Sequence, residues 1–524
     1  MSIVSFVFLG YCLITAILYF AVPKRFQKYI LLLSSIVFYA LYSYKALYYV
    51  VFTSLSIYFG ARGMEKLRDR ANAADTPEER ATKYRKQAKA IFLAALISNL
   101  FILFFLKFFN FSAQNINTLT QLLGGSFRMR TLDILMPLGI SFYTFSAISY
   151  LIDVKREKYR AQQRYDYLLL FMIYFPQLIQ GPINKYDEMA PQLLAGHTVD
   201  YNRVIKGLQR IAWGFFKKLL IADRIAVFVA NVFDIEQNHV GITVFLGALA
   251  YSIQIYGDFS GGIDIVMGFS EILGINMMEN FKRPFFAETL TDFWQRWHIS
   301  LGTWMREYIF YPIAFSPKLN KIGKKLRKAG HKKAAKVIPP SLASVIVFFC
   351  VGIWHGASWR YIVYGLYNGF IISGGILIQD KLDYITHKIF KADTKVFSWR
   401  LFRILRTLLI TTFGRYLSRA DRLRDTWILW KRTFKQWNPW VLFDGSLYKL
   451  GLDRKEFNVI FFALLVLFVV SLYQERSGGS MRDWLNRQNL YFRVAVQVAF
   501  ILVIAVYGYY GPQFEAANFI YAGF

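Results

Sequence analysis

The sequence is poor in the residues that hold disulfide-bonded domains and many metal centres together. Only two of its 524 residues are cysteines, Cys12 and Cys350, and both lie within apolar segments. This argues against a disulfide framework and against a cysteine metal site. No HxxxH, HExxH or CxxC spacing occurs, so no metal is expected. A GxxxxGK[ST] motif, a GxSxG motif and a GxGxxG that opens a helix after a strand are also missing, which leaves ATP-driven transport and a serine hydrolase site without support.

Charged residues are scarce as well, at 18% of the chain, against about 25% in an ordinary soluble domain. Hydrophobic residues make up 55% of the chain, with 50 Phe, 34 Tyr and 12 Trp. Lipid requires every backbone polar group to be bonded internally, which leaves helices or a closed barrel. Apolar runs without period-2 alternation select helices. We therefore predict an all-α, polytopic transmembrane bundle of about 11 crossings with additional re-entrant or interfacial helices; residues 241–257 and 259–275 are expected to be two separate spans.

Acidic residues are few, so that 63 Lys and Arg against 33 Asp and Glu give a net charge of +30. The basic residues cluster between apolar runs, which is typical of the positive-inside rule and of anionic lipid headgroups as partners, and not of nucleic-acid binding. Segments 62–89 and 317–337 carry nine basic residues each and are predicted to be cytoplasmic, with the N-terminus outside. The basic segment 415–435 contains Trp427 and Trp430, with Trp437 just beyond it, and is predicted to be an interfacial amphipathic helix.

Histidine is also rare, with six in the chain, and only two lie in aromatic surroundings of low charge. An ionisable group in such a setting is costly and needs a reason. Those two residues, His298 and His355, are the candidates for chemistry. The others lie in polar or basic loops and are expected to be solvated: His197, His239, His331 and His387.

His355 follows an apolar run that we expect to enter the membrane as a helix near Leu342. Thirteen residues at about 1.5 Å each would place the imidazole roughly 20 Å along that helix, deep in a core about 30 Å thick. Gly352 and Gly356 would allow a ligand or another backbone to approach closely. A neutral imidazole there could remove a proton from an attacking hydroxyl. The alternative is a structural histidine bonded to a carbonyl within the bundle.

His298 lies in a tryptophan-rich stretch that includes Trp294 and Trp297. The spacing of three and four residues predicts that these three side chains share one face of a helix. Such a helix could carry a functional histidine, or it could be an interfacial anchor in which the histidine is structural.

Several blocks of this sequence resemble the membrane-bound O-acyltransferase (MBOAT) family. The resemblance is strongest to the bacterial branch typified by the alginate O-acetyltransferases. The RWHIS and WHGASW motifs, in this order, are the most specific part of the resemblance. The blocks are MPLGISFYTFSAISYLIDV (136–154), FPQLIQGPI (175–183), KGLQRIAWGFFKKLLIADRI (206–225), 256–273, the block 280–313 and VGIWHGASWRYIVYGLYNG (351–369).

The resemblance implies one MBOAT-like domain over residues 1–524, with its core motifs within 134–380. It implies that His355 and His298 are catalytic. We place Trp294, Trp297, Trp354 and Asn368 along the substrate channel. The activity implied is transfer of an acetyl group from a cytosolic thioester, such as acetyl-CoA, to an extracellular polysaccharide, with no bound cofactor. An extracellular partner similar to SGNH hydrolases and a place in the bacterial cell membrane are implied as well.

The C-terminal residues 519–524 resemble an aromatic motif of many bacterial family members, in which a central tyrosine is thought to relay the acyl group. By this resemblance Tyr521 would be the relay; the alternative is an aromatic tail that docks at the membrane interface. Two other functions stay open. One is D-alanyl transfer to teichoic acid, which the chain length disfavours. The other is a polysaccharide or lipid transporter, for which no pair of symmetric broken helices is visible.

Overall fold

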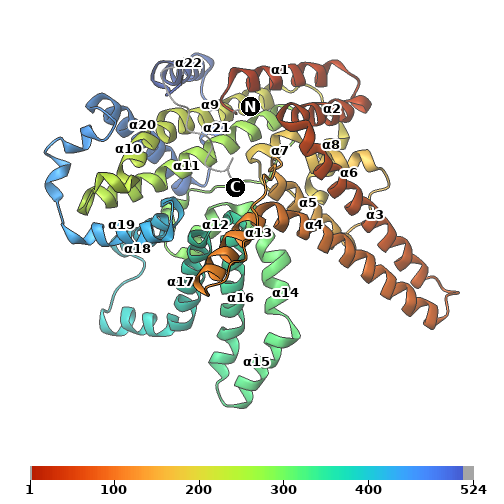
Figure 1. Cartoon of the computed structure of the whole chain (residues 1–524). Helices are drawn as coiled ribbons and strands as arrows, with labels where there is room; N and C mark the ends of the chain where they lie inside the picture. Colours follow the sequence, from red (N-terminus) through yellow and green to blue (C-terminus); the bar gives the residue numbers. More distant parts are fainter. Residues whose placement is uncertain (1–2, 511–524) are drawn as a thin grey trace. The chain divides into compact units, whose positions relative to one another are not determined.

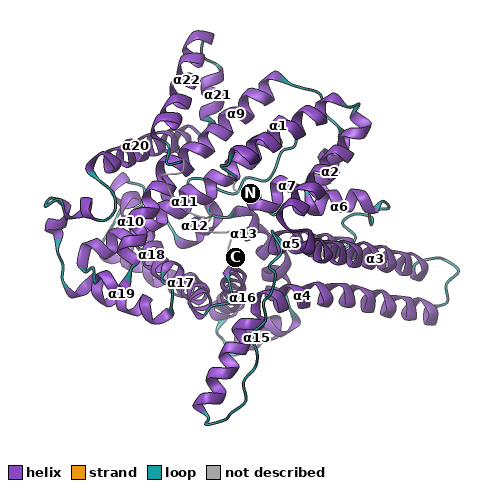
Figure 2. Cartoon of the chain, turned by 45° about the horizontal axis from the view of Figure 1, so that its top comes forward, coloured by secondary structure: helices purple, strands orange, loops and turns teal. Residues whose placement is uncertain are grey.

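The computed structural model describes residues 3–510, and within that range it consists of helices and connecting loops without a strand (Figures 1 and 2). Seven of the described helical segments are long and apolar enough to cross a membrane. The prediction of an all-α, polytopic protein is confirmed, whereas the number of about 11 crossings stays a prediction. Those segments are Lys24–Ala71, Glu78–Leu122, Gly241–Ile272, Lys332–His355, Trp359–Ile389, Arg454–Ser477 and Leu490–Tyr507.

The chain forms two compact units. Unit 1 comprises Met1–Ile211 with Val266–Met278, and unit 2 comprises Ala212–Ile265 with Glu279–Phe524. The helices that lie in unit 1 or begin there are α1 Phe6–Ala21, α2 Lys24–Ser43, α3 Leu47–Ala71, α4 Glu78–Leu122, α5 Ile140–Lys155, α6 Tyr165–Ile173, α7 Phe175–Gln180, α8 Tyr186–Ala195 and α9 Tyr201–Phe215.

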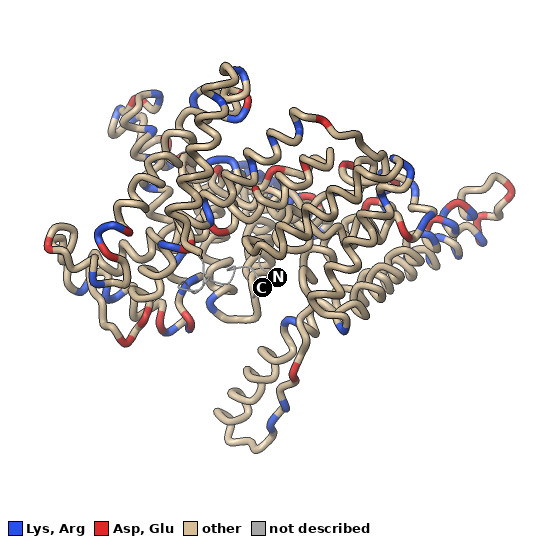
Figure 3. The backbone as a smooth tube through the Cα atoms, turned by 90° about the horizontal axis from the view of Figure 1, so that it is seen from above, with Lys and Arg blue, Asp and Glu red and all other residues tan. Residues whose placement is uncertain are grey.

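Within unit 1, α3 and α4 form a long antiparallel hairpin (Figures 1 and 3). The two helices approach closely at Gly60, where an added Cβ would lie 2.8 Å from the Cβ of Ala95. Lys, Arg, Asp and Glu of segment 62–89 are spread over the far end of the hairpin, as Figure 3 shows. The hairpin therefore has an apolar part that packs and a charged end, which is the pattern that led us to predict a cytoplasmic segment there.

Unit 2 contains the remaining helices. These are α10 Asp223–Phe233, most of α11 Gly241–Ile272, α12 Leu290–Arg296, α13 Ile299–Met305, α14 Tyr311–Ala314, α15 Pro317–Lys328, α16 Lys332–His355, α17 Trp359–Tyr384, α18 Phe397–Arg419, α19 Leu423–Lys435, α20 Arg454–Ser477, α21 Met481–Asn486 and α22 Leu490–Tyr507. Three π-helical segments, Phe216–Ala222, Arg306–Phe310 and Ile385–Ile389, interrupt the α-helical regions.

One sequence prediction about helix boundaries is wrong. Segments 241–257 and 259–275 are one continuous helix, α11, and not two spans. The glycines in its middle serve close packing, since an added Cβ at Gly261 would lie 2.8 Å from the carbonyl oxygen of Gly214. Helix α16 begins at Lys332, before Leu342, and the entry of this helix into the membrane near Leu342 stays a prediction.

Helices α16 and α17 cross with their backbones in direct contact. An added Cβ at Gly352 would meet the backbone of Gly365 at 3.2 Å, and one at Gly369 would lie 3.2 Å from the Cα of Val345. Glycine is needed at these crossings because no larger residue leaves room for the neighbouring backbone. The crossing fixes α17 beside the last turns of α16, where His355 lies.

Candidate active site

His355 is the last residue of α16, and its side chain is buried with 7% of its surface exposed. The helix ends because Gly356 follows with φ 155° and ψ 165°, a backbone conformation that essentially only glycine adopts. The imidazole therefore lies at the end of a long apolar helix, where the chain turns sharply into α17. The prediction that glycine near His355 lets another backbone approach closely is confirmed at Gly352, whereas Gly356 serves the turn.

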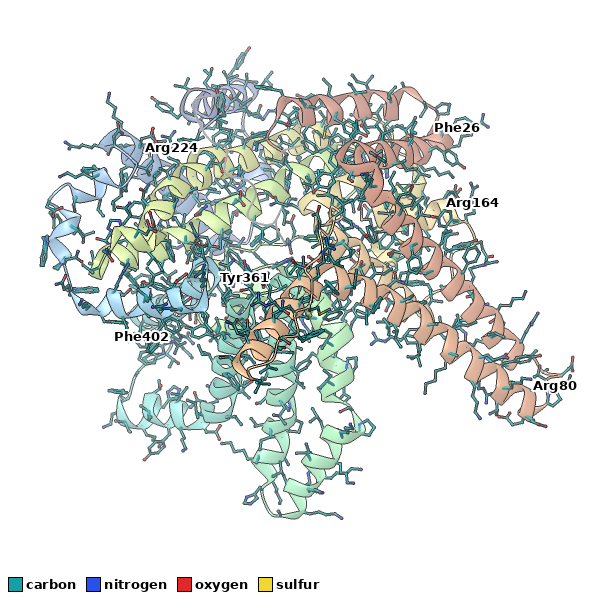
Figure 4. The ribbon with its side chains drawn as sticks, in the orientation of Figure 1. Phe26, Arg80, Arg164, Arg224, Tyr361 and Phe402 are labelled. Carbon is teal, nitrogen blue, oxygen red and sulfur yellow. The ribbon has the colours of Figure 1, made fainter. Side chains whose placement is uncertain are left out.

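Two tyrosines of α17 flank the imidazole of His355. The ring of Tyr361, labelled in Figure 4, is 6.1 Å away and stacked, and the ring of Tyr364 is 6.0 Å away and edge-on. Arg360 donates to the hydroxyl of Tyr361 at 3.2 Å, and Arg415 donates to the hydroxyl of Tyr364 at 3.3 Å. The site thus has phenol walls whose hydroxyls are held by guanidinium groups, and it carries fixed positive charge beside the histidine.

His298 lies between two short helices and not within one. Helix α12 ends at Arg296, and His298 precedes α13 with φ 50° and ψ 52°, a left-handed conformation. The prediction that Trp294, Trp297 and His298 share one helical face is therefore wrong. The cause is a short extended pairing, in which Ile299 N donates to Asn280 O at 3.0 Å and Lys282 N donates to Arg296 O at 2.9 Å.

Asn280 orients the His298 ring. Its side-chain oxygen accepts from the backbone N–H of Ser300 at 2.9 Å and from the Ser300 hydroxyl at 3.0 Å, and it lies 3.3 Å from Nδ1 of His298. The Ser300 N–H can only donate, so the Asn280 atom facing it must be the oxygen. Nδ1 of His298 must then carry the proton and donate to the same oxygen, so that in the neutral ring Nε2 holds the lone pair.

Burial lowers the pKa of His298 well below its ordinary value, and the nearby His355 shifts it further in the same direction. The ring is therefore neutral, as expected of a fully enclosed imidazole whose charged form is disfavoured by burial. Neutral His298 can accept a hydrogen bond or a proton through Nε2. The left-handed backbone stores strain that the surrounding pairing must overcome.

The Trp354 side chain contacts both histidines. Its ring is 5.3 Å from that of His298 and 5.0 Å from that of His355, and the Phe259 ring is 4.9 Å from that of His298. Residues that are 57 positions apart in the chain thus contact one indole. The structure places His298, Trp354 and His355 together in one aromatic cluster of unit 2.

The other predicted channel residues belong to the same neighbourhood. Trp294 donates through Nε1 to the side-chain oxygen of Asn368 at 3.1 Å, and Asn368 in turn donates to the Tyr364 carbonyl at 2.8 Å. The guanidinium carbon of Arg415 lies 4.7 Å from the centre of the Trp297 ring. These residues lie in the neighbourhood of the two histidines. A passage for substrate along these residues stays a prediction.

The remaining histidines differ in exposure. His331 and His387 are exposed, as predicted. His197 and His239 are only half-buried and not fully solvated; Nε2 of His197 lies 3.0 Å from the Gln192 carbonyl oxygen, because the loop folds back on the preceding helix. Among residues 3–510, no group of three or more His, Cys, Asp or Glu could hold a metal ion.

Sequence reasoning missed Asn280, Tyr361 and Tyr364. Asn280 stands at the start of the block 280–313 and is fully buried. The only feature of the sequence that pointed to it was an amide side chain directly before an apolar and basic run. Tyr361 and Tyr364 are spaced three apart after WHGAS, which places both on one face of the next helix. Nothing in the local sequence indicated that Arg360 and Arg415 contact these tyrosines, because their role depends on the crossing of α17 and α18.

The fold and the site define a helical membrane protein with two histidines buried in one aromatic cluster. The model of the MBOAT, membrane-bound O-acyltransferase family matches residues 3–326, and the chain belongs to this family. It is a multi-pass membrane O-acyltransferase, as predicted. The matched region contains His298 and ends before His355.

Individual relatives extend the similarity over most of the chain. A probable alginate O-acetylase AlgI of Pseudomonas syringae pv. tomato is 29% identical over 470 residues, covering 89% of this chain and 82% of the relative. A peptidoglycan O-acetyltransferase of Helicobacter pylori is 29% identical over 418 residues, with 75% and 71% covered. A teichoic acid D-alanyltransferase of Bacillus subtilis is 29% identical, but over only 239 residues, with 45% of this chain and 58% of the relative covered.

Proposed function

We propose that this protein is an O-acetyltransferase of the bacterial cell membrane that moves an acetyl group from a cytosolic thioester, acetyl-CoA, to an extracellular polysaccharide. The observation that carries the proposal is similarity to O-acetylating relatives along most of the chain. The D-alanyltransferase similarity spans less than half of the chain, which disfavours D-alanine as the acyl group. The pairing of His298 and His355 around Trp354 supports chemistry at this place.

In the proposed reaction, His355 acts as the general base. The acceptor hydroxyl oxygen attacks the thioester carbonyl carbon, so that a C–O bond forms and the C–S bond breaks. The hydroxyl proton passes to the His355 imidazole and then to the departing CoA sulfur. His298, with its lone pair on Nε2, accepts a hydrogen bond that orients the reactants. Trp294, Trp297, Trp354 and Asn368 line the path, and the hydroxyls of Tyr361 and Tyr364 face developing charge.

The donor is tested with membrane vesicles that contain the overproduced protein. Vesicles supplied with radiolabelled acetyl-CoA on the cytoplasmic side are expected to release CoA and transfer label to added alginate or peptidoglycan fragments. Vesicles supplied with D-alanine, ATP and a D-alanyl carrier protein are expected to transfer nothing. Transfer of D-alanine without transfer of acetyl would contradict the acetyltransferase and favour the alternative activity.

The acyl relay is proposed at Tyr521, which lies outside the residues that the structure describes. A phenol has a pKa of about 10 and is a poor nucleophile until it is deprotonated, so a relay there needs the imidazole base. We expect Tyr521→Phe to lose acetyl transfer to polysaccharide while CoA release from acetyl-CoA persists through hydrolysis. Normal polysaccharide acetylation by Tyr521→Phe would mean that the acceptor hydroxyl comes directly from an extracellular SGNH-hydrolase-like partner.

A further inference from the structure

A wide apolar groove lies in unit 2, and neither His298 nor His355 is among its lining residues. Its volume between α17, α18 and α19 is about 1040 Å³, slightly above the range of about 300 to 1,000 Å³ that holds small ligands. Phe402 and Leu409 of α18 form one wall, and Trp427 and Phe434 of α19 form the other. Phe402 is labelled in Figure 4.

The walls of the groove are exposed although they are apolar. Phe402 is 51% exposed, Trp427 is 57% exposed and Phe434 is 69% exposed. Exposed apolar patches of this kind mark sites that are covered by a partner or by lipid. The chain belongs to a membrane family, and α19 is the amphipathic helix that its tryptophans and basic residues predict. The acyl chains of membrane lipids are therefore available to cover the groove.

The charged residues that line the groove have one sign. Arg406, Lys431 and Lys435 belong to the lining, and no acidic residue is among the lining residues of this described region. Arg406 donates to the backbone carbonyl of Glu288 at 2.9 Å, which fixes its guanidinium without neutralising it. The ammonium of Lys431 lies 5.3 Å from the centre of the Trp427 ring, so its stem follows the apolar wall. Such an arrangement fits an amphipathic anion.

We propose that this groove binds a single anionic phospholipid, with its acyl chains against Phe402, Trp427 and Phe434 and its phosphate near Lys431 and Lys435. A zwitterionic lipid fits the apolar walls equally well but offers no net charge to the two ammonium groups. An anionic headgroup is therefore favoured, by about fivefold in affinity for each lysine near the surface. The bound lipid would complete the outer surface of the α18–α19 pair.

The test measures quenching of Trp427 fluorescence by brominated lipids. Purified protein is placed in nanodiscs of phosphatidylcholine and phosphatidylglycerol in fixed ratio, with bromine on the chains of either one lipid or the other. The Trp427 contribution is the difference between the wild type and Trp427→Phe. We expect this contribution to be quenched several-fold more by brominated phosphatidylglycerol than by brominated phosphatidylcholine at equal mole fraction.

Two matched variants separate the groove from general basicity. The double variant Lys431→Gln/Lys435→Gln is expected to lose the preference for phosphatidylglycerol. The double variant Lys325→Gln/Lys328→Gln removes two exposed lysines of α15 and is expected to keep it. Equal quenching by both lipids in the wild type, or an unchanged preference after loss of Lys431 and Lys435, would overturn the proposal and leave an ordinary lipid-facing or protein-binding surface. Size-exclusion elution confirms that each variant is folded.

Discussion

Cells in which His355→Ala replaces the wild-type protein are expected to lose surface O-acetylation, with the transfer rate reduced by about 10² to 10⁴-fold. The imidazole is buried at the end of α16, between the phenol rings of Tyr361 and Tyr364. Alanine removes the proposed base without adding volume or charge, so the helix and the turn at Gly356 should stay intact. Alkali-released acetate from purified polysaccharide gives the ester content.

A matched control for this experiment is His331→Ala, because His331 is exposed just before the same helix. It is expected to acetylate at the wild-type level. Immunoblots of membranes must show equal amounts of all variants. A wild-type ester content in cells that carry only His355→Ala would remove His355 from the mechanism and leave His298 as the candidate base.

The variant Lys218→Met is expected to destabilise the protein by about 3 to 5 kcal/mol, because it removes a buried ammonium that contacts two buried carboxylates. The Lys218 ammonium lies 2.7 Å from the Asp223 carboxylate and 2.5 Å from that of Asp258. All three side chains are almost fully buried, with 1% to 4% of each residue exposed. Methionine keeps the length and apolar stem of lysine, so the loss is electrostatic. A lower midpoint of thermal unfolding in detergent, together with reduced yield, is the expected measurement.

The contacts of Lys218 with Asp223 and Asp258 also allow a rescue experiment. Adding Asp258→Asn to Lys218→Met removes one of the two carboxylates that lose the Lys218 ammonium and is expected to recover part of the lost midpoint. Lys325→Met, at an exposed lysine of α15, is the control and should unfold as the wild type does. An unchanged midpoint for Lys218→Met would mean that the two carboxylates are not held as anions by this lysine.

The sequence was sufficient for the class of the fold and for the burial of His298 and His355 among aromatic residues, because both follow from local composition. Apolar runs must be helical in lipid, and an imidazole among Trp and Phe is conspicuous wherever it lies. The helix boundaries around it were less predictable. Asp258 stands between the two predicted spans 241–257 and 259–275, yet α11 continues through it, and Gly261 lets the helix pass close to a neighbouring backbone. Lys332 reads as loop, yet it begins α16.

The geometry of the site could not be predicted, because it depends on residues far apart in the chain. The left-handed backbone at His298 exists only because residues 280–282 pair with residues 296–299. Asn280 selects the tautomer of His298 from 18 residues away. Arg415 reaches the hydroxyl of Tyr364 from 51 residues away. A pattern of period 3.6 contains no information about such contacts.

The glycine crossing of α16 and α17 limits how the catalytic cycle can move. Two helices with backbones in contact at Gly352 and Gly365 have no side-chain layer between them at that point. We therefore expect His355, Tyr361 and Tyr364 to keep their mutual geometry when other parts of unit 2 move. Any opening of the site toward a donor is then expected in segments other than the crossing of α16 and α17.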